Sequence, residues 1–109
     1  MKEMFRTDTF IKWLNKLKDN IGKALIAERI SRLQDGNPGD CSPVEKDLFE
    51  MRIHYGPGYR IYYKDSGQEI IILLCGGDKS TQKQDITKAK KLAKTLMAAN
   101  GEENKDGKN

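Results

Sequence analysis

The feature that most constrains the fold is a period-two alternation of apolar and polar residues between positions 48 and 55. The odd positions are apolar or aromatic, and the even positions include Glu50, Arg52 and His54. Side chains two residues apart in a strand point to the same face of a sheet. The pattern therefore predicts a strand with one apolar face and one polar face.

Two more strands are predicted immediately downstream. Gly56–Gly58 has the composition of a turn and precedes a strand over Tyr59–Lys64. A second turn, Asp65–Gln68, leads into Glu69–Cys75, which is apolar at most positions and therefore belongs in the centre of a sheet. Short connections favour antiparallel pairing, so the three strands are expected to form a meander.

A short strand and two helices are predicted before the meander. Lys2–Arg6 is the strand, and Thr7 or Asp8 can cap the first helix. Asn20 can cap the second helix, which ends at Asp35–Gly39. The apolar residues of the first helix recur at helical spacing: Phe10, Trp13, Leu14 and Leu17. Helices joined this closely are expected to form an antiparallel hairpin.

A final helix is predicted after Gly76–Asp78, where the sheet is expected to end. Ser80 or Thr81 can cap this helix, and Asn100–Gly101 is expected to close it. The element order is β-α-α-β-β-β-α. We therefore predict an α+β fold in which a helical hairpin packs on one face of an antiparallel sheet, with a C-terminal helix.

Length and composition limit the organisation further. The chain has 109 residues, which suits one domain over residues 1–100, followed by a polar tail, 101–109, that we expect to be disordered. Twenty Lys and Arg face sixteen Asp and Glu, and a net charge of +4 favours polyanions or an acidic protein partner. Neither a signal peptide nor a membrane span is recognisable, so a cytoplasmic location is expected. Cys41 and Cys75 form no Cys-x-x-Cys pair, and we expect no metal and no cofactor.

Two arginines on successive predicted strands are the first candidates for a site. A hairpin through Gly56–Gly58 would bring Arg52 beside Arg60, but the sequence leaves their register open. If they share a face, their repulsion favours a bound anion, and phosphate fits a guanidinium well. Alternatively, Arg52 pairs with Glu50 or Asp47 on a solvated face.

The end of the last strand is the second candidate. Lys79 follows two glycines that would let a ligand approach the backbone close to the start of a helix, although Gly-Gly-Asp is also an ordinary turn. The helix that follows carries many lysines, of which Lys83, Lys88 and Lys91 are candidates for contacts with RNA backbone. Such lysines also occur on solvated helix faces.

Two segments resemble a known family. Residues 48–63, Leu-Phe-Glu-Met-Arg-Ile-His-Tyr-Gly-Pro-Gly-Tyr-Arg-Ile-Tyr-Tyr, resemble the signature of the RelE/ParE toxin superfamily, and most closely its HigB-like "addiction module killer" branch. That branch also shows a block like Leu-Leu-Cys-Gly-Gly-Asp-Lys-Ser, residues 73–80, followed by a lysine-rich helix like Asp85–Leu92. The resemblance covers nearly the whole chain except the tail, and it implies the RelE-like fold, whose element order matches the one predicted above.

The resemblance implies the toxin of a type II toxin–antitoxin system. Such a toxin is neutralised by a cognate antitoxin, usually a small DNA-binding protein encoded next to it. Active relatives enter the ribosome and cut mRNA, inhibiting translation. Their chemistry is metal-independent: the 2′-hydroxyl attacks the adjacent phosphate, assisted by basic residues. The chain would then be an endoribonuclease, or mRNA interferase.

Carried over by motif, Arg60 would hold the scissile phosphate, and Arg52 and Lys79 would be further catalytic cations. Tyr62, on the predicted face of Arg60, would join the lysines in RNA binding. The chain departs from RelE-type enzymes in having Glu50 at a lysine position and no aromatic residue over 81–88. The general base is therefore open, with Glu50 and His54 as the candidates.

Two other functions stay open. One is a ParE-like toxin that poisons DNA gyrase by binding, without catalysis. The other is a non-enzymatic RNA-binding module, suggested by a lysine-rich helix after three strands. The nuclease hypothesis requires Arg52 and Arg60 to lie on the same side of the sheet and not to be neutralised by acids of the same chain.

Overall fold

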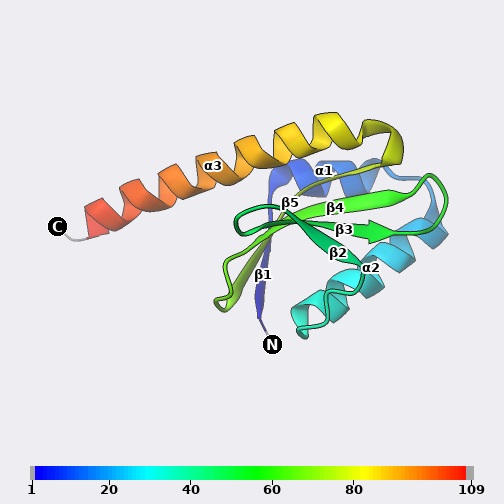
Figure 1. Ribbon diagram of the computed structural model, residues 1–109, viewed down its shortest axis with the longest axis horizontal. Coiled ribbons are helices and arrows are strands. Elements are labelled where there is room, and N and C mark those ends of the chain that lie inside the picture. The colour runs from blue at the N-terminus through cyan, green and yellow to red at the C-terminus, as the bar shows by residue number, and fades with distance from the viewer. Residues whose placement is uncertain (1, 108–109) are drawn as a thin grey trace.

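A computed structural model describes residues 2–107 of the chain, and the side chains of residues 2–96. This region contains a single five-stranded sheet with the spatial order β1-β5-β4-β3-β2 (Figure 1). β1 is parallel to β5, and the other neighbours are antiparallel. The elements are β1 (Glu3–Arg6), α1 (Asp8–Lys16), α2 (Asn20–Gln34), β2 (Cys41–Glu45), β3 (Leu48–Ile53), β4 (Tyr59–Asp65), β5 (Ile70–Asp78), the 3₁₀ turn η1 (Lys79–Thr81) and α3 (Gln82–Gly107).

Helices cover both faces of the sheet, α1 and α2 on one side and α3 on the other. The predicted α+β class, helical hairpin and C-terminal helix are confirmed. The face under α1 and α2 is built on eleven buried residues: Phe10, Ile26, Ile30, Leu33, Met51, Ile53, Tyr59, Ile61, Tyr63, Ile71 and Leu73. The face under α3 has a smaller cluster: Leu48, Tyr62, Leu74, Cys75, Ala89 and Ala93.

Side-chain caps set the starts of the two hairpin helices. The hydroxyl of Thr7 accepts a hydrogen bond from the backbone N–H of Phe10 at 3.0 Å, so Thr7 rather than Asp8 is the cap of α1. For α2 the cap is Asp19, whose carboxylate accepts from Gly22 N at 2.9 Å. The prediction of Asn20 was wrong by one residue, because either side chain can accept this bond and Asp19 is the one that reaches it.

The strand β2 was not predicted from the sequence. It lies at the edge of the sheet and pairs antiparallel with β3, with a register shift between Pro43 and Glu45. Proline has no N–H to donate to a neighbouring strand, so it is tolerated at an edge but argues against a strand in a sequence pattern.

The predicted end of the last strand was also wrong, because β5 continues through both glycines to Asp78. A Cβ atom on Gly76 would lie 2.3 Å from the Trp13 ring, and one on Gly77 would lie 1.7 Å from Asp85 Oδ2. The glycines thus let a helix pack closely on each face, and they form no turn. Asp78, in place of Ser80 or Thr81, caps the helical segment that follows.

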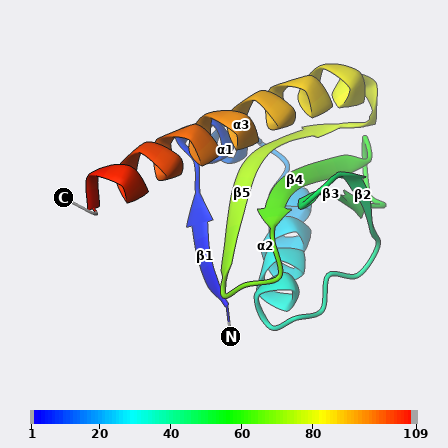
Figure 2. The same cartoon turned by 60° about the vertical axis from the view of Figure 1, so that its left-hand side comes forward.

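The helix α3 extends past Asn100–Gly101, where the sequence predicted its end, and continues to Gly107. Figure 2 shows it crossing the sheet and projecting beyond β1. A glycine inside a helix costs only about 1 kcal/mol, and helix-favouring Glu and Lys residues follow this one. Residues 108 and 109 of the predicted tail lie outside the described residues. None of the described helices has both the length and the apolar character needed to cross a membrane.

Candidate functional site: an arginine cluster

The strand register places Arg52 directly opposite Arg60, and Glu50 directly opposite Tyr62. Opposed residues of an antiparallel pair share a face, so all four side chains lie on the α3 side of the sheet. The two arginines occupy the end of that face nearest η1, where β5 and α3 meet. The register that the sequence left open therefore brings the two guanidinium-bearing residues together.

Glu50 lies between the two arginines and is almost fully buried, with 5% of its surface exposed. Its Oε1 accepts a hydrogen bond from Arg52 Nη1 at 3.1 Å. Its Oε2 accepts from the Tyr62 hydroxyl at 2.9 Å and from Gln82 Nε2 at 2.7 Å, and lies 3.9 Å from Arg60 Nε. The carboxylate thus offsets the repulsion between the arginines and is saturated with donors, which leaves it poorly placed to accept a proton from a ligand.

Tyr62 is fully buried under α3. Burial, followed by its bond to Glu50, raises the pKa of the phenol well above its usual value. The ring is therefore not accessible for stacking on an RNA base in this structure, although the sequence placed it among RNA-binding candidates.

Asp40 completes the cluster from the loop that precedes β2. Its carboxylate accepts from Arg52 Nη2 at 2.9 Å and from Arg52 Nε at 3.4 Å, and its Oδ2 lies 2.5 Å from His54 Nε2. Hydrogen bonds from Arg52, and next from His54, lower the pKa of Asp40 to about 2. His54 is well exposed, so the Asp40–His54 pair stands at the solvent-facing rim of the cluster.

The backbone fixes Asp40 at this position. Its carbonyl accepts from the Arg52 N–H at 2.9 Å and from Arg29 Nη2 at 3.3 Å. Arg29, on α2, also donates to Pro38 O at 3.2 Å and to Arg52 O at 2.7 Å. Asp40 and Arg29 were not predicted from the sequence, since their contacts join segments far apart in the chain and no local pattern signals them.

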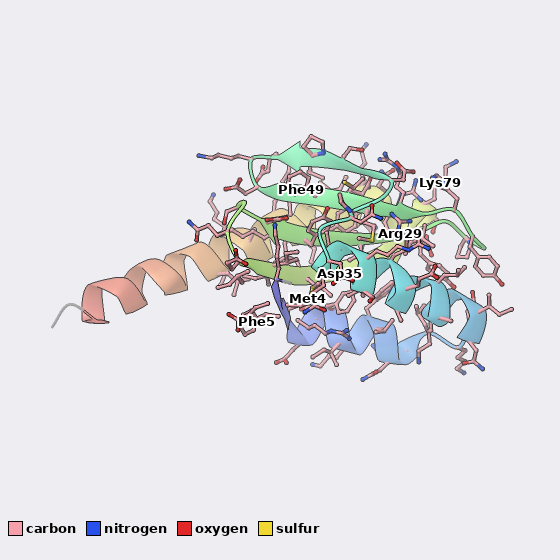
Figure 3. All side chains as sticks on the ribbon, turned by 90° about the horizontal axis from the view of Figure 1, so that it is seen from below. Met4, Phe5, Arg29, Asp35, Phe49 and Lys79 are labelled. Atoms are coloured by element: carbon pink, nitrogen blue, oxygen red, sulfur yellow. The ribbon has the colours of Figure 1, made fainter. Side chains whose placement is uncertain are left out.

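Arg60 differs from Arg52 in its partners. Its Nη1 donates to Gly58 O at 2.7 Å, and its buried Nε has no hydrogen-bond partner among the described residues. Gly58 has a φ of 80°, and a Cβ there would lie 2.9 Å from Arg60 Nη1 and 3.5 Å from Lys79 Cβ. Lys79 is therefore beside this turn, and it lies at the opposite end of the sheet from Phe5 (Figure 3).

The cluster meets one of the two requirements of the nuclease hypothesis. Arg52 and Arg60 share a side of the sheet, but Arg52 is ion-paired with both Asp40 and Glu50. Arg60 Nε also lies 3.9 Å from Glu50 Oε2, and its side chain is 11% exposed against 27% for Arg52, whereas Lys79 is exposed. The three lysines proposed to bind RNA lie on the exposed surface of α3, at positions 83, 88 and 91.

Comparisons with known proteins find solved structures and a protein sequence that are similar to this chain. A copper-bound point mutant of a toxin from Helicobacter pylori superimposes with a TM-score of 0.56 at 23% identity, covering 73% of this chain and 97% of the other. A conserved hypothetical protein of H. pylori, solved in solution, gives a TM-score of 0.48 at the same identity and coverage. An uncharacterized protein of Haemophilus influenzae is 54% identical over 90 residues, which are 83% of this chain and 91% of the relative.

The sheet, the helical hairpin and the crossing α3 thus define an α+β protein with the RelE-like toxin fold. Residues 12–98 match the family described as "Phage derived protein Gp49-like (DUF891)". The chain belongs to this Gp49-like family, a family of RelE/HigB-type toxins, and the resemblance drawn from its two sequence blocks is confirmed. The family implies a cognate antitoxin as a partner.

Proposed function

We propose that this toxin is a metal-independent endoribonuclease that cuts mRNA on the ribosome, with the arginine cluster as its active site. The observation that carries the proposal is the chain of contacts from Arg52 through Asp40 to His54. Next to it lies Arg60, whose Nε has no hydrogen-bond partner among the described residues. A carboxylate that holds one nitrogen of a histidine favours the tautomer whose other nitrogen accepts a proton. This is the arrangement of a general base.

The residues of the cluster then take different roles. His54 is the base, and Asp40 orients its ring. Arg60 and Lys79 contact the scissile phosphate and stabilise the charge that develops on it. Arg52 and Glu50 are positioning residues, because Arg52 holds Asp40 and Glu50 holds both arginines.

The reaction needs no further reactant. His54 takes the proton of a ribose 2′-hydroxyl, and the O2′–P bond forms as the P–O5′ bond breaks. The departing O5′ takes a proton from solvent water, and His54 later returns its proton to solvent. The products are a 2′,3′-cyclic phosphate and a 5′-hydroxyl end. The guanidinium of Arg60 and the ammonium group of Lys79 would stabilise the phosphate transition state through charge and positioning.

The test is induction in bacteria of the unchanged chain, Arg60→Ala, His54→Ala and a control, Arg32→Ala, on the exposed side of α2. Growth and the 5′ ends of mRNA are followed together. We expect growth arrest with codon-phased cuts for the unchanged chain and the control, and a loss of cutting of at least 100-fold for His54→Ala and Arg60→Ala. Cutting that survives both substitutions would disprove this active site.

One observation favours a second function. Arg52 is neutralised within the chain, and a ParE-like toxin that poisons DNA gyrase by binding has no need of free cations at this site. Growth arrest with double-strand DNA breaks, intact messages and no effect of Arg60→Ala would establish that alternative.

A further inference from the structure

A groove opens at the other end of the α3 face, away from the arginine cluster. It has a volume of about 650 Å³ and lies between the β2–β3 turn, the end of β4 and the middle of α3. Its lining residues are Glu45, Lys46, Asp47, Leu48, Lys64, Thr87, Lys90, Lys91, Ala93 and Lys94. Leu48 and Lys64 are opposed in the register, four residues along each strand from Arg52 and Arg60. The proposed catalytic chemistry uses none of these residues.

The floor of the groove is apolar. Leu48 and Ala93 are 1% and 8% exposed, and both belong to the core cluster under α3. Lysine side chains add aliphatic stems along the walls while their amino groups reach solvent. A ligand that fills this groove gains from burying an apolar group as well as from charge.

The rim of the groove is basic. Five lysines face two acids, and Lys90 Nζ lies 3.9 Å from Glu45 Oε1 across it. Within the described part of the chain, the other four lysines form no ion pair: Lys46, Lys64, Lys91 and Lys94. An occupant that carries carboxylates would compensate this charge, because opposite potentials across an interface favour association.

We propose that the groove binds an acidic amphipathic segment of the cognate antitoxin, with an apolar side chain on Leu48 and Ala93 and carboxylates against the lysine rim. The inference rests on the toxin–antitoxin function and gives the partner a place on the fold. An apolar floor favours a protein segment over RNA, whose phosphates would gain nothing from Leu48. The antitoxin segment would then bind away from the arginine cluster.

The experiment measures antitoxin affinity. The product of the adjacent reading frame is co-expressed with the toxin, separated in denaturant and refolded, and its dissociation constant is measured by fluorescence anisotropy. The variants are Lys46→Glu/Lys94→Glu, which reverses charge on two sides of the groove, and Thr87→Trp, which fills it. The matched control is Lys12→Glu/Lys16→Glu on the exposed side of α1.

We expect both groove variants to weaken binding at least tenfold and the control to change it less than twofold. Circular dichroism reports whether each variant is folded. A photoreactive residue at position 90 should in addition form cross-links with the antitoxin. Unchanged affinity in both folded groove variants, or cross-links to RNA in place of the antitoxin, would overturn the proposal, as would a neighbouring product that does not bind at all.

The mRNA assay separates this inference from the proposed nuclease. If messages stay intact while the groove variants lose antitoxin affinity, the proposed active site is disproved and the proposed antitoxin-binding groove is supported. If messages are cut and the groove variants bind the antitoxin with unchanged affinity, the proposed antitoxin-binding groove is disproved and the proposed nuclease is supported.

Discussion

The two faces of the sheet differ in what they bury. The face under α1 and α2 buries apolar and aromatic side chains, centred on residues such as Phe10 and Ile61 that have no exposed surface. The face under α3 buries two carboxylates, Glu50 and Asp85, among a smaller apolar cluster. Burying charge costs free energy that pairing and hydrogen bonds must offset. Here Glu50 is bonded to Arg52, Tyr62 and Gln82, and Asp85 accepts a hydrogen bond from the Thr81 hydroxyl. The comparison indicates that the face under α1 and α2 supplies most of the apolar core, while the face under α3 contains the candidate site.

The strongest test of this division is Phe10→Ala, on the apolar face. Removing a fully buried phenylalanine side chain should lower the free energy of unfolding by about 3–5 kcal/mol, since the cavity left in the core does not fully collapse. Urea unfolding measures the change. Phe5→Ala is the control, because Phe5 is 51% exposed and its removal should cost far less. Equal losses for the two variants would contradict the assignment of the core.

On the α3 face, Glu50→Gln should lower the free energy of unfolding by about 1–3 kcal/mol. The substitution keeps the volume of the side chain but removes the charge that compensates Arg52 and Arg60. Added phosphate should therefore restore part of the lost stability, because an anion that binds only the folded chain stabilises it. The change in melting temperature on adding phosphate measures this effect, and Glu69→Gln, at an exposed position, is the control.

A smaller effect is expected from Asp40, which lies at the exposed rim of the same face. Because the folded-state pKa of Asp40 lies near 2, below the ordinary value of 3.8, its pairing stabilises the fold fully above pH 4. That contribution is lost as the pH falls from about 4 to about 2. The difference in melting temperature between the unchanged chain and Asp40→Asn should shrink over that window. A constant difference would mean that the carboxylate charge does not contribute.

The elements with strong local patterns could be predicted from the sequence. The hairpin helices and the meander follow from periodicity and turn residues, and the resemblance of two blocks gave the family. The strand β2 could not be predicted, because Pro43 argues against a strand and only the edge position tolerates it.

Parts of the candidate site could not be predicted from the sequence, because they depend on tertiary contacts. Glu50 lies on the polar face of its strand pattern and is nevertheless buried, because α3 crosses over it and donates a hydrogen bond from Gln82. Asp40 reaches Arg52 from a loop twelve residues upstream, at a distance that only the pairing of β2 with β3 sets. The local sequence pattern predicts neither of these two contacts.

The shape of the β2 edge also bears on how the toxin behaves when it is free of its antitoxin. An open sheet edge is a template on which further copies of a chain can add strand by strand and aggregate. Pro43 has no N–H to donate, and the register shift beside it interrupts regular pairing along the β2 edge. The opposite edge strand, β1, is only four residues long. Either edge of the sheet is therefore expected to pair poorly with a further copy of the chain when the antitoxin is absent.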